Sequence, residues 1–324
     1  MNADSGIVSA TVLGRNSADI PVGMNAVEGY KASNNGDGLR VLEDLPQIIE
    51  RGAAALTPAE KELLKWIGVF FRKPTPGKFM MRIRMPNGFA RSAQLRTIAE
   101  LSRRLGNGVL DITTRQQIEL RGFTLDTVPE IFEKLRGVDL RTLQTGIDNV
   151  RNINGCALAG LAPNELFDAS PVVHELDRLI VGAKGNPEFT NLPRKFNITV
   201  TGCMDNCTHS ESQDIALVPA KKAGRIGFNV LVGGKMGSGG FTVASPLNVF
   251  VEIFQAGVID EDAGDSQRPH LVQHRLVQDE IAAKQVLLRL LRMGYGHRQL
   301  HARRSLFNRY DQHDRRLLSC RSNI

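Results

Sequence analysis

The segment from Phe79 to Met85 alternates apolar and cationic side chains, and it constrains the fold more than any other part of the chain. Because successive side chains of a β-strand point to opposite faces, this alternation predicts a strand with one apolar face. Arg82 and Arg84 then share the other face. An uncompensated buried charge costs several kcal/mol, so these arginines require acidic partners, an anionic ligand or water.

The residues after this segment alternate between helical and strand patterns. Apolar periodicity predicts helices over residues 92–105 and 127–135, with a strand over residues 109–120 between them. The buried faces are expected to carry Leu95, Ile98, Leu101 and Leu105 in the first helix, and Ile112, Ile118 and Leu120 in the strand. The strand–helix–strand–helix order predicts a small α+β sandwich.

The N-terminal region shows little periodicity until a helix start appears. We interpret residues 1–50 as an extended arm. Thr57 and Glu60, with Pro58 in the first turn, predict a helix that begins with a capping box. Apolar residues at helical spacing continue to Phe71, so we expect the helix to reach that point.

A second structural unit follows near residue 145. Strands are predicted over residues 195–201, 214–218 and 227–232. The glycine-rich residues 233–240 lack the spacing of a dinucleotide-binding loop, and a strand-like segment follows them rather than a helix. Two interpretations stay open for these glycines: close approach of backbone N–H groups to an anionic ligand, or a plain hairpin loop.

Composition changes abruptly after about residue 252. The last part of the chain is rich in arginine and histidine and contains Lys284 as its single lysine. A truncated or frameshifted reading frame would give this composition, and a functional basic tail is the alternative. Few aromatic residues interleave with the charges, which argues against nucleic-acid binding. The expected organisation is an arm (1–54), a first domain (55–144), a second domain (145–256) and a divergent tail (257–324).

The charge balance and the apolar runs bound the class of protein. The net charge of +7 suits an anionic substrate or cofactor. No apolar run is long enough to span a bilayer, and the N-terminus lacks the pattern of a signal peptide. We therefore expect a cytoplasmic protein that does not interact with membranes.

Cationic side chains recur in the strand-like segments. Arg82 and Arg84 are followed by Arg115 and Arg151 in later segments, and Lys195 shares a predicted strand face with Asn197. No acidic residue lies near Arg82, Arg84 or Lys195 on the same face of its own segment. The pattern fits either a solvated sheet face or a polyanionic ligand.

Five segments, in order and at similar spacing, resemble the ferredoxin-dependent nitrite reductase family. They are FMMRIRMPNG (79–88), DITTRQ (111–116), GIDNVRN (146–152), NLPRKFN (191–197) and GFNVLVGG (227–234). The resemblance covers residues 55–252 and implies a ferredoxin-like half-domain followed by a mixed α/β sirohaem-binding domain. It also implies that this chain is the N-terminal half of such an enzyme.

The resemblance implies reduction of nitrite to ammonium at sirohaem, with ferredoxin as electron donor. Sirohaem is rich in carboxylates, which would account for cations on several strands. The residues implied to surround the substrate are Arg84 (or Arg82), Arg151, Lys195 and Asn197. The residues implied to bind the cofactor are Arg82, Arg115, Gln116, Arg121, Asn152 and Arg194.

Asn197 bears on the choice of substrate. Members that reduce sulfite have a second lysine at this position, whereas nitrite carries less charge and suits one lysine beside a neutral amide. We therefore expect nitrite rather than sulfite as the substrate, with sulfite reduction as the alternative. A non-catalytic module that binds sirohaem and pairs with a separately encoded C-terminal half is a further alternative.

The cysteines do not complete an iron–sulfur ligand set. The family holds a [4Fe-4S] cluster with a C-x₅-C and a C-x₃-C motif in its second half. Here Cys203 and Cys207 form a C-x₃-C pair that only Cys156 precedes. We interpret the pair as structural thiols at the counterpart of the cluster loop, with metal ligands, including a zinc site with His209, as the alternative.

Overall fold

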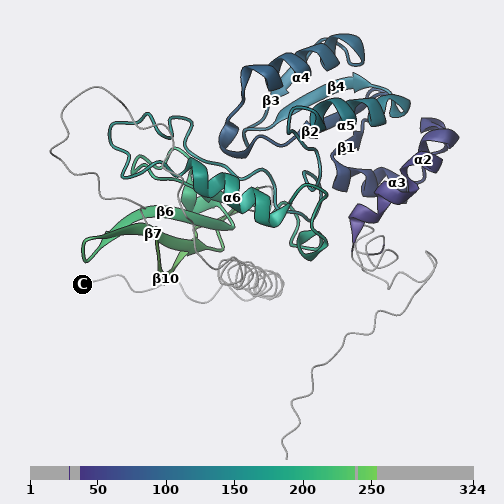
Figure 1. The fold of residues 1–324 in the computed structure, drawn as a ribbon. Coiled ribbons are helices and arrows are strands. Elements are labelled where there is room, and N and C mark those ends of the chain that lie inside the picture. The colour runs from purple at the N-terminus through teal and green to yellow at the C-terminus, as the bar shows by residue number, and fades with distance from the viewer. Residues whose placement is uncertain (1–28, 30–36, 238–239, 254–324) are drawn as a thin grey trace, which may run out of the picture. The chain divides into compact units, whose positions relative to one another are not determined.

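The computed structural model describes residue 29 and residues 37–237 and 240–253. These residues form two compact units (Figure 1). The first comprises the chain through Asn152 together with Ile180–Phe196, and the second comprises Ile153–Leu179 and the residues from Asn197 onward. The predicted α+β class is confirmed. Within the described part of the chain, no helix is both long and apolar enough to cross a membrane.

The first unit is built on a four-stranded antiparallel sheet. Its strands are β1 (Val69–Phe71), β2 (Phe79–Ile83), β3 (Leu110–Ile112) and β4 (Ile118–Phe123), in the order β1-β2-β4-β3. Two helices, α4 (Ser92–Arg104) and α5 (Val128–Arg136), lie beside each other along the sheet (Figure 1). The sheet is the platform for the cationic residues described below.

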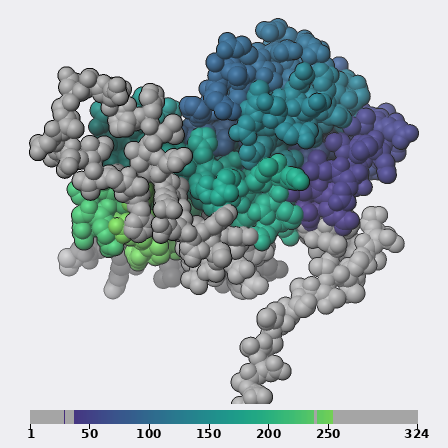
Figure 2. Space-filling view, in the orientation of Figure 1, coloured from purple at the N-terminus to yellow at the C-terminus, as the bar shows by residue number. Residues whose placement is uncertain are grey.

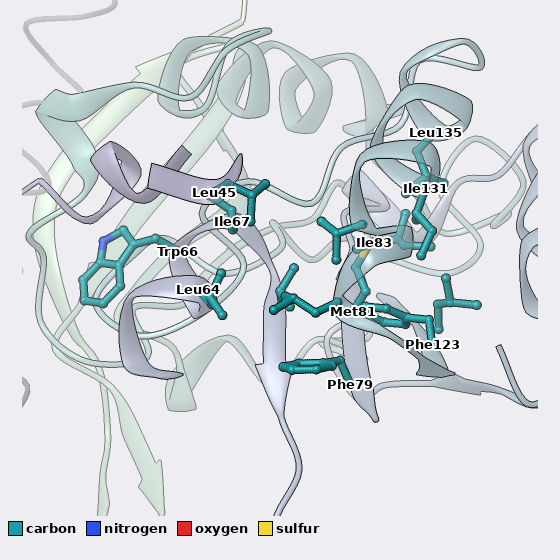
Figure 3. Packing of buried hydrophobic residues seen from close by; sticks show 14 of the residues in the cluster. Leu45, Leu64, Trp66, Ile67, Phe79, Met81, Ile83, Phe123, Ile131 and Leu135 are labelled. Atoms are coloured by element: carbon teal, nitrogen blue, oxygen red, sulfur yellow. The ribbon is translucent and has the colours of Figure 1, made fainter. Parts of the chain in front are cut away.

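The predicted apolar face of the 79–85 segment is confirmed. Phe79, Met81 and Ile83 are at most 1% exposed and belong to the core cluster of the first unit (Figure 3). Phe123 from β4 stacks on Phe79 with ring centroids 6.2 Å apart. One face of β2 therefore packs into the core, and Arg82 lies on the opposite face.

The helix that begins at Thr57 is shorter in the structure than predicted. The capping box at Thr57 is confirmed, but α3 (Pro58–Leu63) passes into a 3₁₀ turn that ends at Ile67. Gly68 follows with φ of +82°, and an added Cβ would lie 2.4 Å from the Thr142 carbonyl oxygen. The chain therefore turns at this glycine, and Phe70 and Phe71 belong to β1 rather than to a helix.

The expectation of an extended arm is wrong for its last residues. Residues 41–51 form α2 (Val41–Arg51), which buries Val41, Leu45 and Ile48 in the core. These positions have the i, i+4, i+7 spacing of an amphipathic helix, a signal that Pro46 within the segment obscured. In Figure 2 the purple N-terminal helices pack directly against the rest of the first unit.

The predicted strand over residues 109–120 is a hairpin instead. β3 and β4 pair antiparallel, and a tight turn over residues 113–117 joins them. Gln116 adopts φ of +57°, and the Thr113 hydroxyl accepts hydrogen bonds from the N–H groups of Arg115 and Gln117. Ile112 is 85% exposed, so it does not share a buried face with Leu120. In α4, Ile98 and Leu101 are buried as expected.

Leu95 was expected to be buried but is 46% exposed, because it lies off the narrow stripe that contacts the sheet.

The remaining 3₁₀ segments are short: Gly38–Arg40, Ala53–Ala55, Pro86–Gly88, Leu125–Thr127, Pro187–Phe189 and Ser210–Ser212.

The second unit contains a mixed four-stranded sheet. Its strands are β5 (Ile198–Val200), β6 (Ile215–Lys222), β7 (Arg225–Val232) and β10 (Ser245–Glu252), in the order β10-β7-β6-β5. β5 and β6 run parallel, and the other pairs are antiparallel. All but the last residue of α6 (Ser170–Ile180) belongs to this unit. The glycine-rich segment forms a hairpin from β8 (Lys235–Gly237) and β9 (Gly240–Thr242).

The two units are not continuous in sequence. Residues 145–152 belong to the first unit, and Ile180–Phe196 returns to it after a long excursion into the second. The domain boundaries inferred from the sequence, including the one at residue 145, stay predictions. The predicted tail, residues 257–324, lies outside the described residues.

The burial of α2 gives a direct test of its structural role. Ile48→Ala removes a fully buried side chain and should lower the free energy of unfolding by between about 2 and 5 kcal/mol. Gln47→Ala, on the exposed side of the same helix, should change it by less than about 0.5 kcal/mol. Urea denaturation measures both variants. Equal, negligible effects would show that α2 does not contribute to the core.

Candidate functional site

Arg151 is a buried cation in the segment between α5 and α6. Its side chain is 5% exposed, and its terminal nitrogens donate to the backbone oxygens of Thr145 and Ile147, the latter at 3.0 Å. The Nε atom is also buried and has no hydrogen-bond partner among the described residues. Buried donors are normally satisfied, so this nitrogen marks a place where a ligand would be stabilised.

The pKa of the Arg151 guanidinium is lowered from its ordinary value to about 9. Burial is the largest cause, followed by the positive charges of Arg82 and Arg115; Arg194 adds to the decrease, and Asp148 opposes it. The lowered pKa means that the surroundings disfavour the charged form of Arg151. Three cations from separate segments of the first unit therefore act on Arg151.

Arg84, which the family resemblance places beside the substrate, is held by backbone oxygens. Its side chain is 2% exposed, and Nη1 donates to the backbone oxygens of Gln144 at 3.2 Å and Val150 at 3.1 Å. Nη2 donates to the backbone oxygen of Arg151 at 3.0 Å. The guanidinium thus ties β2 to the segment that carries Arg151. Of the two arginines considered for anion contact, this geometry favours Arg82.

Arg82 lies on the partly exposed side of β2. Its Nε donates to Glu119 Oε1 at 3.0 Å across the sheet, and its guanidinium lies 4.5 Å from the centre of the Phe70 ring. Glu119 also forms an ion pair with Arg121 at 2.8 Å, and Arg121 pairs in addition with Asp111. The segment of Arg82 has no acid on that face, and the neighbouring strand β4 supplies Glu119 instead. Arg82 shares this carboxylate with Arg121.

Arg115 and Gln116 occupy the turn between β3 and β4. Both are half-buried, and Gly88 packs closely against Gln116, with an added Cβ 3.1 Å from the Gln116 Cβ. The side chain of Asn152 reaches the same turn and donates to the Arg115 backbone oxygen at 2.8 Å. The turn is thereby fixed on both sides.

Arg194 and Lys195 are exposed residues at the end of the returning segment of the first unit. Lys195 has φ of +60°, and its N–H donates to the Ile147 backbone oxygen at 3.2 Å. Because β5 begins only at Ile198, the predicted strand face shared by Lys195 and Asn197 is not formed. The left-handed backbone of Lys195 is the physical reason.

Asn197 belongs to the second unit, where a buried carboxylate orients it. Its main-chain N–H donates to Asp214 Oδ2 at 2.8 Å, and its side-chain nitrogen lies 3.4 Å from the same oxygen. Asp214 is 2% exposed. Sequence reasoning did not pair Asp214 with Asn197 or Glu119 with Arg82, because the partners lie 17 and 37 residues apart in the chain. Asp148, which acts on Arg151, is only three residues away, but its side chain was not considered as a partner.

The three described cysteines belong to the second unit. Cys156 and Cys203 are buried, Cys207 is exposed, and all three are free thiols. Burial raises the pKa of the Cys156 thiol; a hydrogen bond from Leu158 opposes the rise, and nearby Cys203 and Cys207 add to it. No group of three His, Cys, Asp or Glu side chains in the described part of the chain is placed to hold a metal ion.

Comparisons with known proteins agree with this architecture. Residues 71–138 match the nitrite/sulfite reductase ferredoxin-like half domain, and residues 146–259 match the nitrite and sulphite reductase 4Fe-4S domain. A ferredoxin–nitrite reductase of Leptolyngbya laminosa is 44% identical over 71% of this chain and 45% of its own length. One from Synechococcus elongatus is 46% identical over 66% of this chain and 43% of its own length.

A solved structure gives the same result for the fold. The Mycobacterium tuberculosis NirA protein superposes with a TM-score of 0.63 and 26% identity, covering 73% of this chain and 46% of that one. The chain therefore spans less than half the length of these relatives.

The contrast between Arg84 and Arg82 can be tested by stability alone. Arg84→Met leaves three backbone oxygens without their donor and should lower the free energy of unfolding by at least about 3 kcal/mol. Arg82→Met leaves Glu119 paired with Arg121 and should cost less than about 1 kcal/mol. Chemical denaturation of both variants measures the difference, and the reverse order would contradict the assignment.

The lowered pKa of Arg151 predicts a pH dependence. Above about pH 9 the folded protein releases the Arg151 proton, whereas the unfolded chain keeps it to a much higher pH. Stability therefore rises with pH in this window, by at most about 1.4 kcal/mol per pH unit. The stability of the ligand-free protein relative to Arg151→Gln should increase between pH 9 and pH 10.5 in urea denaturation. A constant difference would show that the charge is not disfavoured.

Proposed function

Because the chain belongs to the nitrite and sulfite reductase family, we propose that it contributes the arginine-rich part of a sirohaem site for nitrite reduction. The single observation that supports this most directly is the buried guanidinium of Arg151, on which the positive charges of Arg82, Arg115 and Arg194 act. Like charges are not held near a buried guanidinium without compensation. A carboxylate-rich macrocycle supplies that compensation, and an unpartnered Nε on Arg151 provides a donor for an anion.

The roles follow from exposure and from existing partners. Arg82 and Arg151 hold the nitrite anion and offset the negative charge that develops as electrons are added and its oxygens leave. Lys195, which is exposed, supplies protons. Carboxylates of sirohaem are bound by Arg115, Gln116, Arg121 and Arg194. When bound, sirohaem supplies the iron at which nitrite is reduced to ammonium.

Nitrite is the proposed substrate, rather than sulfite, for a reason of charge. Position 197 holds a neutral amide, and Asp214 orients that amide through both the main chain and the side chain. A lysine at this position would favour a dianion more than a monoanion. The relatives from Leptolyngbya laminosa and Synechococcus elongatus are named ferredoxin–nitrite reductases. Their names favour nitrite as the substrate and suggest ferredoxin as the electron donor.

An iron–sulfur cluster does not fit the described cysteines. Cys156, Cys203 and Cys207 lie near one another, but they are not arranged with other ligands around a metal. We therefore assign no cluster ligand in the described residues. Residues outside the described part of the chain would then provide the cluster ligands, and pairing with a C-terminal half is part of the proposal.

Titration of the purified chain with sirohaem tests the proposal. Loss of one charged hydrogen bond corresponds to about 1.5–3 kcal/mol, so Arg115→Gln should weaken binding at least about tenfold. Arg103→Gln, an exposed arginine on α4 of the same unit, is the matched control and should bind as the wild type does. The absorption band of sirohaem measures both.

Binding should also weaken with added salt, because the attraction between the arginines and the carboxylates is screened. Absence of binding by the wild-type chain, or equal loss in both variants, would refute the proposed site.

A further inference from the structure

Asn152 is the residue directly after Arg151, and its side chain is used entirely within the protein framework. It is 1% exposed. Its Oδ1 accepts from the Met85 N–H at 2.9 Å, and its Nδ2 donates to the Met85 backbone oxygen at 2.7 Å. The second hydrogen of Nδ2 serves the Arg115 backbone oxygen at 2.8 Å. The amide thus joins the end of β2 to the turn that carries Arg115.

The family resemblance implies that Asn152 binds the cofactor directly. The hydrogen bonds of its side chain conflict with that role. A primary amide has two N–H donors, and both are directed at backbone oxygens here. The side chain has no donor left for a carboxylate of a ligand. What Asn152 can control is the position of the backbone that it holds.

The held backbone matters because Arg115 acts on Arg151. The charge of Arg115 lowers the pKa of Arg151, so the two guanidinium groups are close enough to interact. Arg151 is placed by the segment that contains Asn152, and Arg115 is placed by the turn that Asn152 holds. One amide therefore fixes the relative position of two cations on separate segments.

Gly88 packs against Gln116 from outside the turn, but this contact does not join the turn to the segment of Arg151. The Thr113 hydroxyl accepts from the Arg115 N–H at 3.3 Å, and the Gln116 N–H donates to the Thr113 backbone oxygen at 2.9 Å. Both bonds lie inside the turn and set its shape. The bond from Asn152 ties the turn to the segment of Arg151, so its loss would let an intact turn move.

We infer that Asn152 is a positioning residue for the anion site: it sets the spacing of Arg115 and Arg151 by holding the 113–117 turn against the end of β2. The inference rests on the proposed function, since it assigns the spacing to the binding of a polycarboxylate. An aspartate at this position would have the same shape, but without the two donors, and could not replace the amide.

The first test needs no ligand. Amide hydrogen exchange should accelerate at least about tenfold in residues 113–117 of Asn152→Ala and remain unchanged in α4. Asn149→Ala is the matched control, because Asn149 is equally buried but donates only to the Gly146 backbone oxygen within its own segment. Unchanged exchange in the turn of Asn152→Ala, or equal acceleration in the control, would overturn the inference.

The second test separates positioning from a general loss of structure. Sirohaem affinity is measured for wild type, Asn152→Ala, Arg115→Gln and the double variant. Asn152→Ala should weaken binding about tenfold alone but less than about twofold in the Arg115→Gln background, because its effect passes through Arg115. An equal loss in both backgrounds would overturn the inference. If Asn152→Ala does not fold, Asn152→Asp, which keeps the acceptor for Met85, takes its place in the cycle.

The two proposals can fail separately. If the wild-type chain does not bind sirohaem, the proposed function fails, and the exchange experiment still decides whether Asn152 holds the turn. If the wild type binds and the cycle is additive, the proposed function stands and the positioning role of Asn152 is refuted.

Discussion

The first unit depends on the burial of two guanidinium groups against one short stretch of backbone. Arg84 from β2 and Arg151 from the following segment together bind five backbone oxygens between residues 144 and 151. Such oxygens have no partner in regular secondary structure, so the arginines replace the ladder that a helix or strand would provide. Side-chain hydrogen bonds thereby fix the backbone of this irregular segment, as main-chain hydrogen bonds fix a strand.

This arrangement explains why the irregular segment can place a charge. Ile147 has φ of +49°, and Gln144 and Thr145 are fully buried, so the segment has neither repetitive geometry nor contact with water. Arg84 satisfies the segment from one side, and Asn152 attaches its end to β2 and to the neighbouring turn. Sites built on supported backbone of this kind hold their charges in fixed positions before a ligand arrives.

Much of the fold was predictable, because local patterns determine it. The alternation at 79–85 and the capping box at Thr57 each depend on neighbouring residues, and both are confirmed. The hairpin at 113–117 and the left-handed Lys195 were not predicted, since each depends on backbone angles that periodicity does not encode. The helix at 41–51 does show helical spacing, but Pro46 within it argued against a helix. The site residues stay predictions, and the sequence could not distinguish an arginine bound to backbone oxygens, such as Arg84, from a partly exposed one, such as Arg82.

The balance of charge then bears on what the site can bind. Arg82 and Arg121 share Glu119, Asp111 serves Arg121, and Asp148 acts on Arg151. Arg82, Arg115 and Arg194 lower the pKa of Arg151 and Asp148 raises it, so the charge that acts on Arg151 has a positive excess. A single monoanion would leave part of that excess uncompensated, whereas a polycarboxylate and a monoanion together would neutralise more of it. Repulsion among these arginines lowers the stability of the folded protein, and binding of such anionic ligands offsets that repulsion.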